Sequence, residues 1–267
     1  MTTVFSPPLN ARRISSALAG QAIGCEVRVH EELASTNDLA RELGMAGFPH
    51  GLVILTESQS SGRGRRDNRW HAPPGRDVLM TVLLRPDARV EFWPRLTTIA
   101  ALTICKAIEA TTTLKPQIKW PNDVYITDRK TAGILAETFT GPGGAFMALG
   151  IGLNVNSDWF QSDLRTTATS LLLENSEEKQ ALDRNAIIIA LLKHLQHLER
   201  RLSSGFDEII REVKQRSWLL GRRVRAITEQ REVSGIATDV DDEGRLVVRQ
   251  DDGVLLKLTS AEQVRLA

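Results

Sequence analysis

The sequence predicts an α+β protein with a large mixed-sheet domain up to about residue 216 and a small β-barrel after it. Apolar strand-like runs alternate with amphipathic helical segments in the first part. From Leu219 onward, short strands are separated by turns rich in Gly and Asp, which is typical of a small barrel. A chain of 267 residues with 42% hydrophobic residues is long enough for one large core and a smaller one.

Charge and cysteine content limit the classes of function. Basic and acidic side chains nearly balance, 34 against 33, so no overall field would attract nucleic acid or an anionic membrane. Two cysteines, Cys25 and Cys105, are too few for a disulfide framework and indicate buried free thiols in a reducing compartment. No apolar run is long enough to cross a bilayer, and residues 14–25 lack the continuous apolar segment of a secretion signal. We expect a cytoplasmic protein, with a secreted protein as the alternative.

Strand and helix signals alternate in the first half of the large domain. Alternating apolar and polar side chains mark a half-buried strand, whereas apolar residues three or four apart mark one face of a helix. Ser35, Thr36 and Asn37 are good capping residues, and Pro94 precedes a second helical pattern. The elements expected here are strands over 25–31, 51–59 and 77–85 and helices over 38–45 and 96–108.

The second half continues the sheet and then becomes helical before the barrel. Strands flank the Trp120-Pro121 pair, and Asp183 can cap a long helix that Gly205 closes. His194 and His197 share a face of that helix without a third ligand, so no dedicated metal site is expected. The expected elements are strands over 117–119, 124–126, 131–139 and 145–156, helices over 184–203 and 207–218, and barrel strands over 222–227, 233–239, 246–250 and 254–258.

An arginine-rich loop carries the first candidate site. Residues 60–67, Ser-Ser-Gly-Arg-Gly-Arg-Arg-Asp, follow an apolar strand and place three arginines beside two glycines. Glycine lets the backbone approach a ligand, and the arginine fork suits phosphate or carboxylate. Asp67 stands where a dinucleotide-binding turn needs glycine, and no Gly-Lys pair forms a P-loop. A single copy between a strand and Trp70 favours a dedicated ligand loop over an RNA-binding or nuclear-targeting element.

A second polar cluster lies further along the chain. Lys119 and Lys130 flank a predicted hairpin with Asn122-Asp123 between them, so both lysines can face one pocket and neutralise charge on a phosphate or carboxylate. Two surface lysines are the alternative. Gly150 and Gly152 in an apolar strand indicate that a ligand or another backbone comes close, although packing alone explains them equally well.

Taken together, these motifs resemble those of the biotin–protein ligases. The matching segments are 35–37, 62–66 with Trp70, 119–123, 129–135 and 150–156. The resemblance implies a mixed-sheet fold of the class II synthetase-like biotin/lipoate ligase type, followed by a small SH3-like β-barrel. It implies an N-terminal extension over residues 1–24, a catalytic biotin- and ATP-binding domain over 25–216 and the C-terminal domain over 217–267.

The resemblance implies a two-step ligase reaction. Biotin and ATP, the latter with Mg²⁺, first give biotinyl-5′-adenylate and pyrophosphate. A specific lysine of a biotin carboxyl carrier protein then attacks the mixed anhydride. Because a carboxylate is a poor acyl donor, conversion to an adenylate supplies a better leaving group, and closure of the arginine loop would protect the intermediate from water.

The resemblance also assigns roles to individual residues. Lys130, Arg63 and Asp123 are expected in catalysis, with Lys130 bridging the biotin carboxylate and the α-phosphate and Asp123 orienting Lys130 or the incoming lysine. The expected biotin-binding residues are Ser35, Thr36, Asn37, Gln59, Gly62, Arg63, Gly64, Arg65, Lys130 and Gly133. The expected ATP- and adenylate-binding residues are Arg65, Arg66, Trp70, Lys119, Asn122, Lys130 and Asn154, with Asn122 reading the adenine.

Two features depart from the family pattern. Asp67 stands where the family often has glycine, which leaves the mobility of the loop open. Only 34 residues precede Ser35, too few for the DNA-binding helix-turn-helix of the members that double as repressors, so no DNA binding is expected. By analogy with relatives that pair through sheet edges, the strand from Ala145 is a candidate edge for a homodimer.

Other functions remain open. A lipoate–protein ligase or octanoyl transferase shares the catalytic fold, although an aliphatic acyl pocket does not call for the cluster at residues 35–37. A non-catalytic biotin sensor is a second alternative, although Lys130 and Arg63 favour catalysis. An RNA-binding protein is disfavoured by the neutral net charge.

Overall fold

The computed structural model describes residues 6–66, 68–162, 164–175, 180–228 and 231–267, so Asp67 lies outside the described residues. In the large domain the elements are α1 (Ala11–Ala17), β1 (Val27–Leu33), α2 (Thr36–Met45), β2 (Val53–Gln59), β3 (Val78–Leu84), a short 3₁₀ helix (Val90–Phe92), α3 (Arg95–Thr111), β4 (Gln117–Lys119), β5 (Asp123–Ile126), β6 (Arg129–Gly141), β7 (Gly144–Leu153), α4 (Leu171–Glu174), α5 (Arg184–Glu199) and α6 (Phe206–Gln215). The smaller sheet contains β8 (Arg223–Ile227), β9 (Glu232–Val240), β10 (Leu246–Arg249), β11 (Leu255–Leu258) and β12 (Gln263–Leu266).

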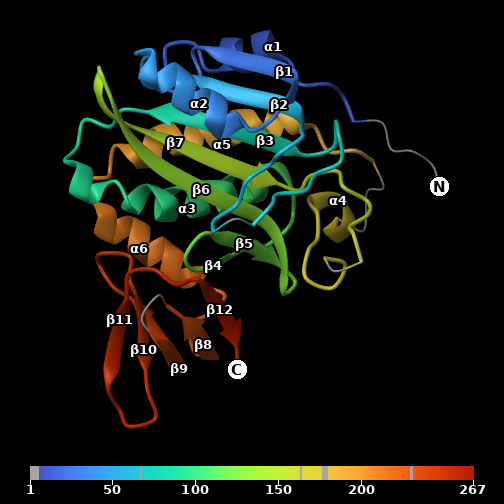
Figure 1. The fold of residues 1–267 in the computed structure, drawn as a ribbon. Helices are drawn as coiled ribbons and strands as arrows, with labels where there is room; N and C mark the ends of the chain where they lie inside the picture. The colour runs from blue at the N-terminus through green and yellow to red at the C-terminus, as the bar shows by residue number, and fades with distance from the viewer. Residues whose placement is uncertain (1–5, 67, 163, 176–179, 229–230) are drawn as a thin grey trace.

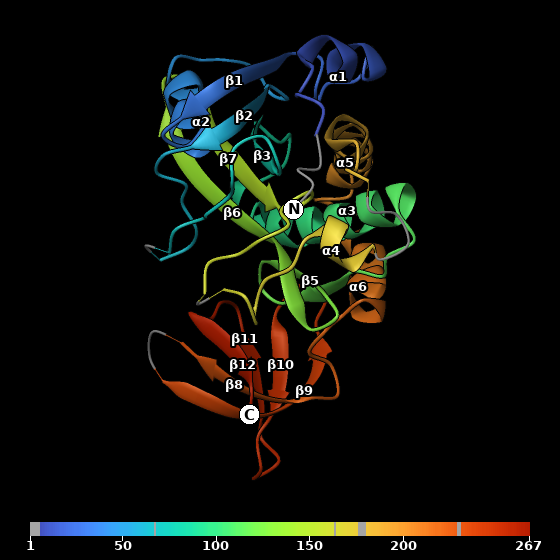
Figure 2. The ribbon, with the colours of Figure 1, turned by 90° about the vertical axis from the view of Figure 1, so that its right-hand side faces the viewer.

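The large sheet is mixed, which confirms the expected fold class. Among the described residues its strand order is β1-β2-β3-β7-β6-β5-β4, with β1 and β2 parallel and the other neighbours antiparallel (Figure 1). Helix α2 lies on one face, and α3 and α5 lie on the other (Figure 2). Successive side chains of a strand point to opposite faces of the sheet, so one strand contributes apolar residues to the cores on both faces. Val53 and Leu55 belong to the core under α3 and α5, whereas Leu52 and Ile54 belong to the core under α2.

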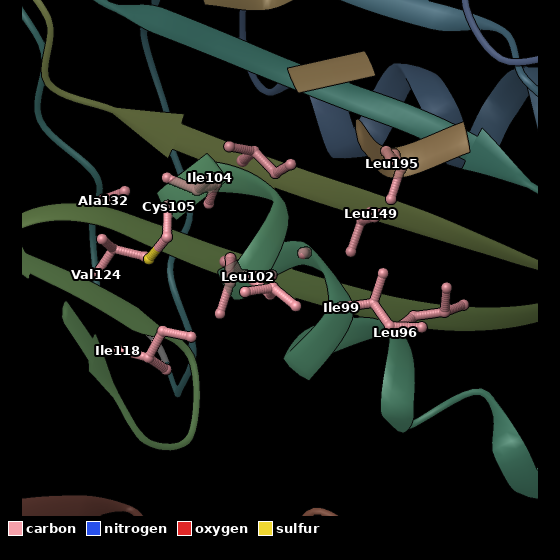
Figure 3. Packing of buried hydrophobic residues seen from close by; sticks show 14 of the residues in the cluster. Leu96, Ile99, Leu102, Ile104, Cys105, Ile118, Val124, Ala132, Leu149 and Leu195 are labelled. Atoms are coloured by element: carbon pink, nitrogen blue, oxygen red, sulfur yellow. The ribbon is translucent and has the colours of Figure 1, made fainter. Parts of the chain in front are cut away.

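The larger core is built around α3. Figure 3 shows Leu96, Ile99 and Leu102 of this helix with Leu149 of β7 and Leu195 of α5, all fully buried. Each such side chain contributes about 1.5–3 kcal/mol through its removal from water. No helix in the described ranges combines the length and the apolar character needed to cross a membrane.

The C-terminal sheet is antiparallel, with the strand order β11-β10-β9-β8-β12, and confirms the expected small β domain. The predicted acidic hairpin turns end at Gly244 and Gly253, and both glycines have the positive φ that such turns favour. Trp120 connects this sheet to the large one, because its indole Nε1 donates to the carbonyl of Gly244 at 2.9 Å. Sequence reasoning missed β12, since only two of its four residues are apolar.

Three other expectations differ from the structure. The N-terminal segment contains α1, which Asn10 caps and which buries Ile14. Sequence reasoning gave this stretch no element, because its serines hide the helical pattern. The strand from Ala145 is not a sheet edge, since β7 lies between β3 and β6. Cys25 is exposed, and only Cys105 is a buried thiol.

A buried carboxyl at the end of α5 makes stability depend on pH. Glu199 is 9% exposed, its Oε2 lies 3.5 Å from Nε2 of His50, and burial raises the pKa of Glu199 from 4.5 to about 7. The folded state therefore binds this proton more tightly than the unfolded chain does. The resulting stability is fully present below pH 4.5 and is lost as the pH rises through about 7.

Glu199→Gln is therefore expected to stabilise the protein at pH 8, by up to about 3 kcal/mol, and to have little effect at pH 4.5. The amide occupies the same volume and cannot ionise. Urea unfolding of both proteins at the two pH values measures the effect, and an equal difference at both values would contradict it.

Candidate active site

The two motifs predicted to share a ligand meet around one cavity of about 180 Å³. The cavity lies between the N-terminus of α2, the loop that joins β2 to β3, and strands β3, β5, β6 and β7. The predicted site residues that line it are Ser35, Thr36, Asn37, Gln59, Arg63, Gly64, Arg65, Trp70, Asn122, Asp123, Lys130 and Gly133. Gly150 and Gly152, where the sequence predicted a close approach, also line it. The lining residues to which the sequence assigned no role are Asn68, Arg69, Leu79, Met80, Ile134, Leu135, Ile151 and Glu262.

One end of the cavity is neutral and hydrogen-bonding. Helix α2 begins after Ser35, whose side chain makes no capping bond, so its hydroxyl is not committed to the helix. The backbone N–H of Thr36 donates to Oε1 of Gln59 at 2.8 Å, which joins the end of β2 to the start of α2. Thr81 Oγ1 lies 2.8 Å from Thr36 Oγ1 and 2.6 Å from Asn37 Oδ1. These buried bonds fix the polar groups before any ligand arrives.

The other end is cationic and is built by the hairpin of β5 and β6. Thr127 and Asp128 at its tip both adopt positive φ, which closes a tight turn. Asp123 on β5 pairs in register with Gly133 on β6, and a Cβ at Gly133 would lie 3.2 Å from Nζ of Lys130, so the lysine side chain reaches back over Gly133 toward the carboxylate. Lys130 Nζ forms an ion pair with Asp123 Oδ1 at 2.6 Å.

The arginine loop closes this cationic end. Arg65 Nη1 donates to Oδ1 of Asn122 at 3.0 Å, and the Asn122 amide in turn donates to the carbonyl of Ile134 at 3.0 Å. Burial, with the nearby charge of Arg66, lowers the pKa of Arg65 from its ordinary value. A guanidinium that is partly desolvated beside like charge gains from an anionic ligand.

Four predicted site residues do not line this cavity. Gly62 lines a neighbouring one. Arg66 forms an ion pair with Glu262, which brings the C-terminal sheet to the site.

Lys119 donates from Nζ to the Tyr125 hydroxyl at 2.8 Å, and burial lowers the pKa of Lys119. Asn154 is buried and donates to the carbonyl of Thr169 at 2.9 Å. Lys119 and Asn154 are thus bonded to neighbouring protein groups, and their contact with a nucleotide stays a prediction.

Gly150 and Gly152 of β7 accommodate side chains rather than backbone. A Cβ at Gly150 would lie 2.3 Å from Oδ1 of Asn37, and a Cβ at Gly152 would lie 2.5 Å from the Trp70 ring. Both neighbours line the cavity. The glycines thus allow the amide and the indole to lie against the sheet and form cavity walls.

Across the described ranges, no group of three or more His, Cys, Asp or Glu is placed to hold a metal ion. Of the two described carboxylates that line the cavity, Asp123 is paired with Lys130 and Glu262 with Arg66.

Known proteins with similar sequences and folds belong to one family. Residues 29–156 match the Biotin/lipoate A/B protein ligase family, and residues 219–262 match the Biotin protein ligase C terminal domain. The chain is 33% identical over 247 residues to the biotin--[acetyl-CoA-carboxylase] ligase of Mycobacterium tuberculosis, covering 90% of each chain. It is 32% identical over 258 residues to the bifunctional ligase/repressor BirA of Bacillus subtilis, covering 95% of this chain and 78% of that protein.

A solved structure shares the fold. The biotin protein ligase of Aquifex aeolicus in complex with biotin and ATP superposes with a TM-score of 0.79 at 23% identity, covering 91% of this chain and 99% of that one. The two family matches cover the large sheet from β1 to β7 and most of the C-terminal sheet, and the Mycobacterium relative is similar along nearly its whole length. The chain therefore belongs to the biotin protein ligase family.

Proposed function

We propose that this protein is an ATP-dependent ligase that forms biotinyl-5′-adenylate and transfers the biotin to a specific lysine of a biotin carboxyl carrier protein. The observation that carries the proposal is a single cavity with a neutral hydrogen-bonding end and a cationic end. Biotin has the matching chemistry, since its ureido ring is neutral and polar and its valerate ends in a carboxylate. Family membership supports the same activity.

Biotin lies with its ureido ring at the α2 end in this proposal. The Ser35 hydroxyl and the Thr36 and Gln59 groups supply donors and acceptors there. Leu79, Met80 and Ile151 add an apolar wall for the rest of the bicycle and the aliphatic chain. The carboxylate then points toward Lys130.

Lys130 is the proposed catalytic group of the first step. A carboxylate oxygen of biotin attacks the α-phosphorus of ATP, the new C–O–P link forms, and the bond to pyrophosphate breaks. The ammonium of Lys130 neutralises charge on the carboxylate and the α-phosphate as they approach, and Asp123 fixes its position through the 2.6 Å ion pair. In the second step the acceptor amine attacks the biotinyl carbonyl and AMP leaves.

The proposed nucleotide contacts centre on Arg65. It lines the cavity and is aligned by Asn122, so Asn122 acts here by holding Arg65 rather than by reading adenine. Trp70 offers its ring as a stacking surface beside Lys130, whose Nζ lies 5.6 Å from the ring centroid. Mg²⁺ enters with ATP and is held mainly by phosphate oxygens, in keeping with its preference for oxygen ligands and retained water.

Pyrophosphate release tests the function directly. Wild-type protein with MgATP and no acceptor is expected to release pyrophosphate with biotin, but not with lipoate or octanoate offered separately. Release with lipoate or octanoate and not with biotin would show that the protein adenylates a different carboxylic acid. Release with none of the three would mean that the cavity binds without catalysing adenylation.

A further inference from the structure

Arg63 is occupied by protein carboxylates in this structure. Its Nη1 and Nη2 donate to Oε1 and Oε2 of Glu137 at 2.9 and 2.8 Å. Asp38 Oδ1 lies 2.9 Å from Arg63 Nη2 on the other side. A bidentate pair with both partners charged is among the stronger polar contacts available to arginine, and the Glu137 side chain is only 24% exposed.

Glu137 also contacts Asn37, which lines another part of the cavity. Its Oε2 accepts a hydrogen bond from Nδ2 of Asn37 at 2.7 Å. Glu137 itself does not line the cavity, whereas Arg63 and Asn37 both do. One carboxylate on β6 therefore joins the arginine loop to the N-terminus of α2.

The bonds within the loop do not replace this attachment. Trp70 N donates to the carbonyl of Gly62 at 3.0 Å, and Gly64 N donates to the carbonyl of Asn68 at 2.7 Å. Both bonds connect one side of the loop to the other, so they shape it without fixing it to the sheet. Of the loop arginines, Arg65 bonds to Asn122 next to β5, Arg66 pairs with Glu262 of the C-terminal domain, and Arg63 bonds to β6.

We propose that Glu137 is a positioning residue that keeps the arginine loop closed over the cavity through Arg63 and couples that closure to Asn37. Arg63 acts as a tether to the sheet, and the ligand-facing charge belongs to Arg65 and Lys130. The role rests on the proposed function, since a closed loop retains a biotinyl-adenylate that water would hydrolyse and that diffusion would release.

Limited proteolysis of the ligand-free protein tests whether Glu137 holds the loop, and this test does not require enzymatic activity. Trypsin cleaves after exposed arginines, and the loop carries several. Glu137→Gln keeps the size of the side chain and its ability to accept from Asn37, but it loses the charge that holds Arg63. We expect cleavage within the loop to accelerate about tenfold, as for loss of one charge-assisted contact. The matched control is Glu32→Gln, an exposed carboxylate on β1, which should leave cleavage unchanged.

The rate at which the enzyme releases biotinyl-adenylate tests whether the closed loop retains this intermediate. In Glu137→Gln, release of biotinyl-adenylate from the enzyme is expected to accelerate about tenfold, with the rate of its formation at saturating substrates within about twofold of wild type. Arg63→Ala should give the same release rate, and the double variant should be no worse than Arg63→Ala alone. A thermal midpoint close to that of wild type separates positioning from loss of the fold.

Several outcomes would overturn the proposal. Unchanged cleavage in Glu137→Gln would show that the pair does not hold the loop. Additive effects in the double variant would show that Arg63 contacts the ligand independently of Glu137. If wild-type protein forms no adenylate, the proposed function fails, whereas the proteolysis result still decides whether the tether exists.

Discussion

Lys130→Ala is expected to reduce the rate of adenylate formation by about 1000-fold while leaving the fold intact. Removing a fixed group that neutralises developing charge lowers the rate of the catalysed step by about 100- to 1000-fold in comparable sites. Here one ammonium neutralises charge on both the carboxylate and the phosphate. The side chain is 33% exposed and lies in a cavity rather than in the core, so truncation leaves the packing of the sheet unchanged.

The control for Lys130 is Lys115→Ala, which removes an exposed lysine in the segment between α3 and β4. Pyrophosphate release by both variants, with circular dichroism and thermal unfolding in parallel, makes the comparison. Biotin binding by Lys130→Ala should persist in calorimetry, because the ureido end of the cavity is untouched. Adenylation at the wild-type rate in this variant would remove Lys130 from the mechanism.

Most of the large domain could be predicted because its core obeys simple periodicity. The helical spacing of apolar residues over 96–108 predicted α3, whose Leu96, Ile99 and Ile108 are fully buried. Asp183 caps α5 as expected by accepting from the N–H groups of Asn185 and Ala186. Elements without such a pattern were missed. Helix α4 has only four residues and its boundaries depend on the tertiary contacts of the segment around it.

The site was predictable where chemistry is carried by a motif and unpredictable where it depends on register. Arg65 was expected because of its charge and its position next to Gly64, and Lys130 because of its charge and its place on the hairpin that carries Asp123. Glu137 gave no signal, since a glutamate in a strand usually faces solvent. It meets Arg63 only because β6 extends past its pairing with β5 and places this carboxylate beneath the loop. Glu262 reaches Arg66 from the C-terminal domain, a contact between segments far apart in the sequence.

Gly150→Ala is expected to weaken biotin binding by about 100-fold, with a smaller effect on stability. The new Cβ would lie 2.3 Å from Asn37 Oδ1, so the amide must move. It would then lose its contacts with Thr81 and Glu137, which lie 2.6 and 2.7 Å away, and would be displaced within the neutral end of the cavity. Calorimetric titration with biotin measures the loss.

The control is Gly143→Ala, since a Cβ there meets its nearest neighbour, Arg85, at an ordinary 3.5 Å. The double variant Gly150→Ala with Asn37→Ala identifies the cause. If the alanine at 150 acts only by displacing the amide, the double variant binds biotin as Asn37→Ala does, because no amide remains to be displaced. Binding weaker than in Asn37→Ala would mean that the extra methyl occupies space that biotin itself needs, and Gly150 would then limit the size of the ligand directly.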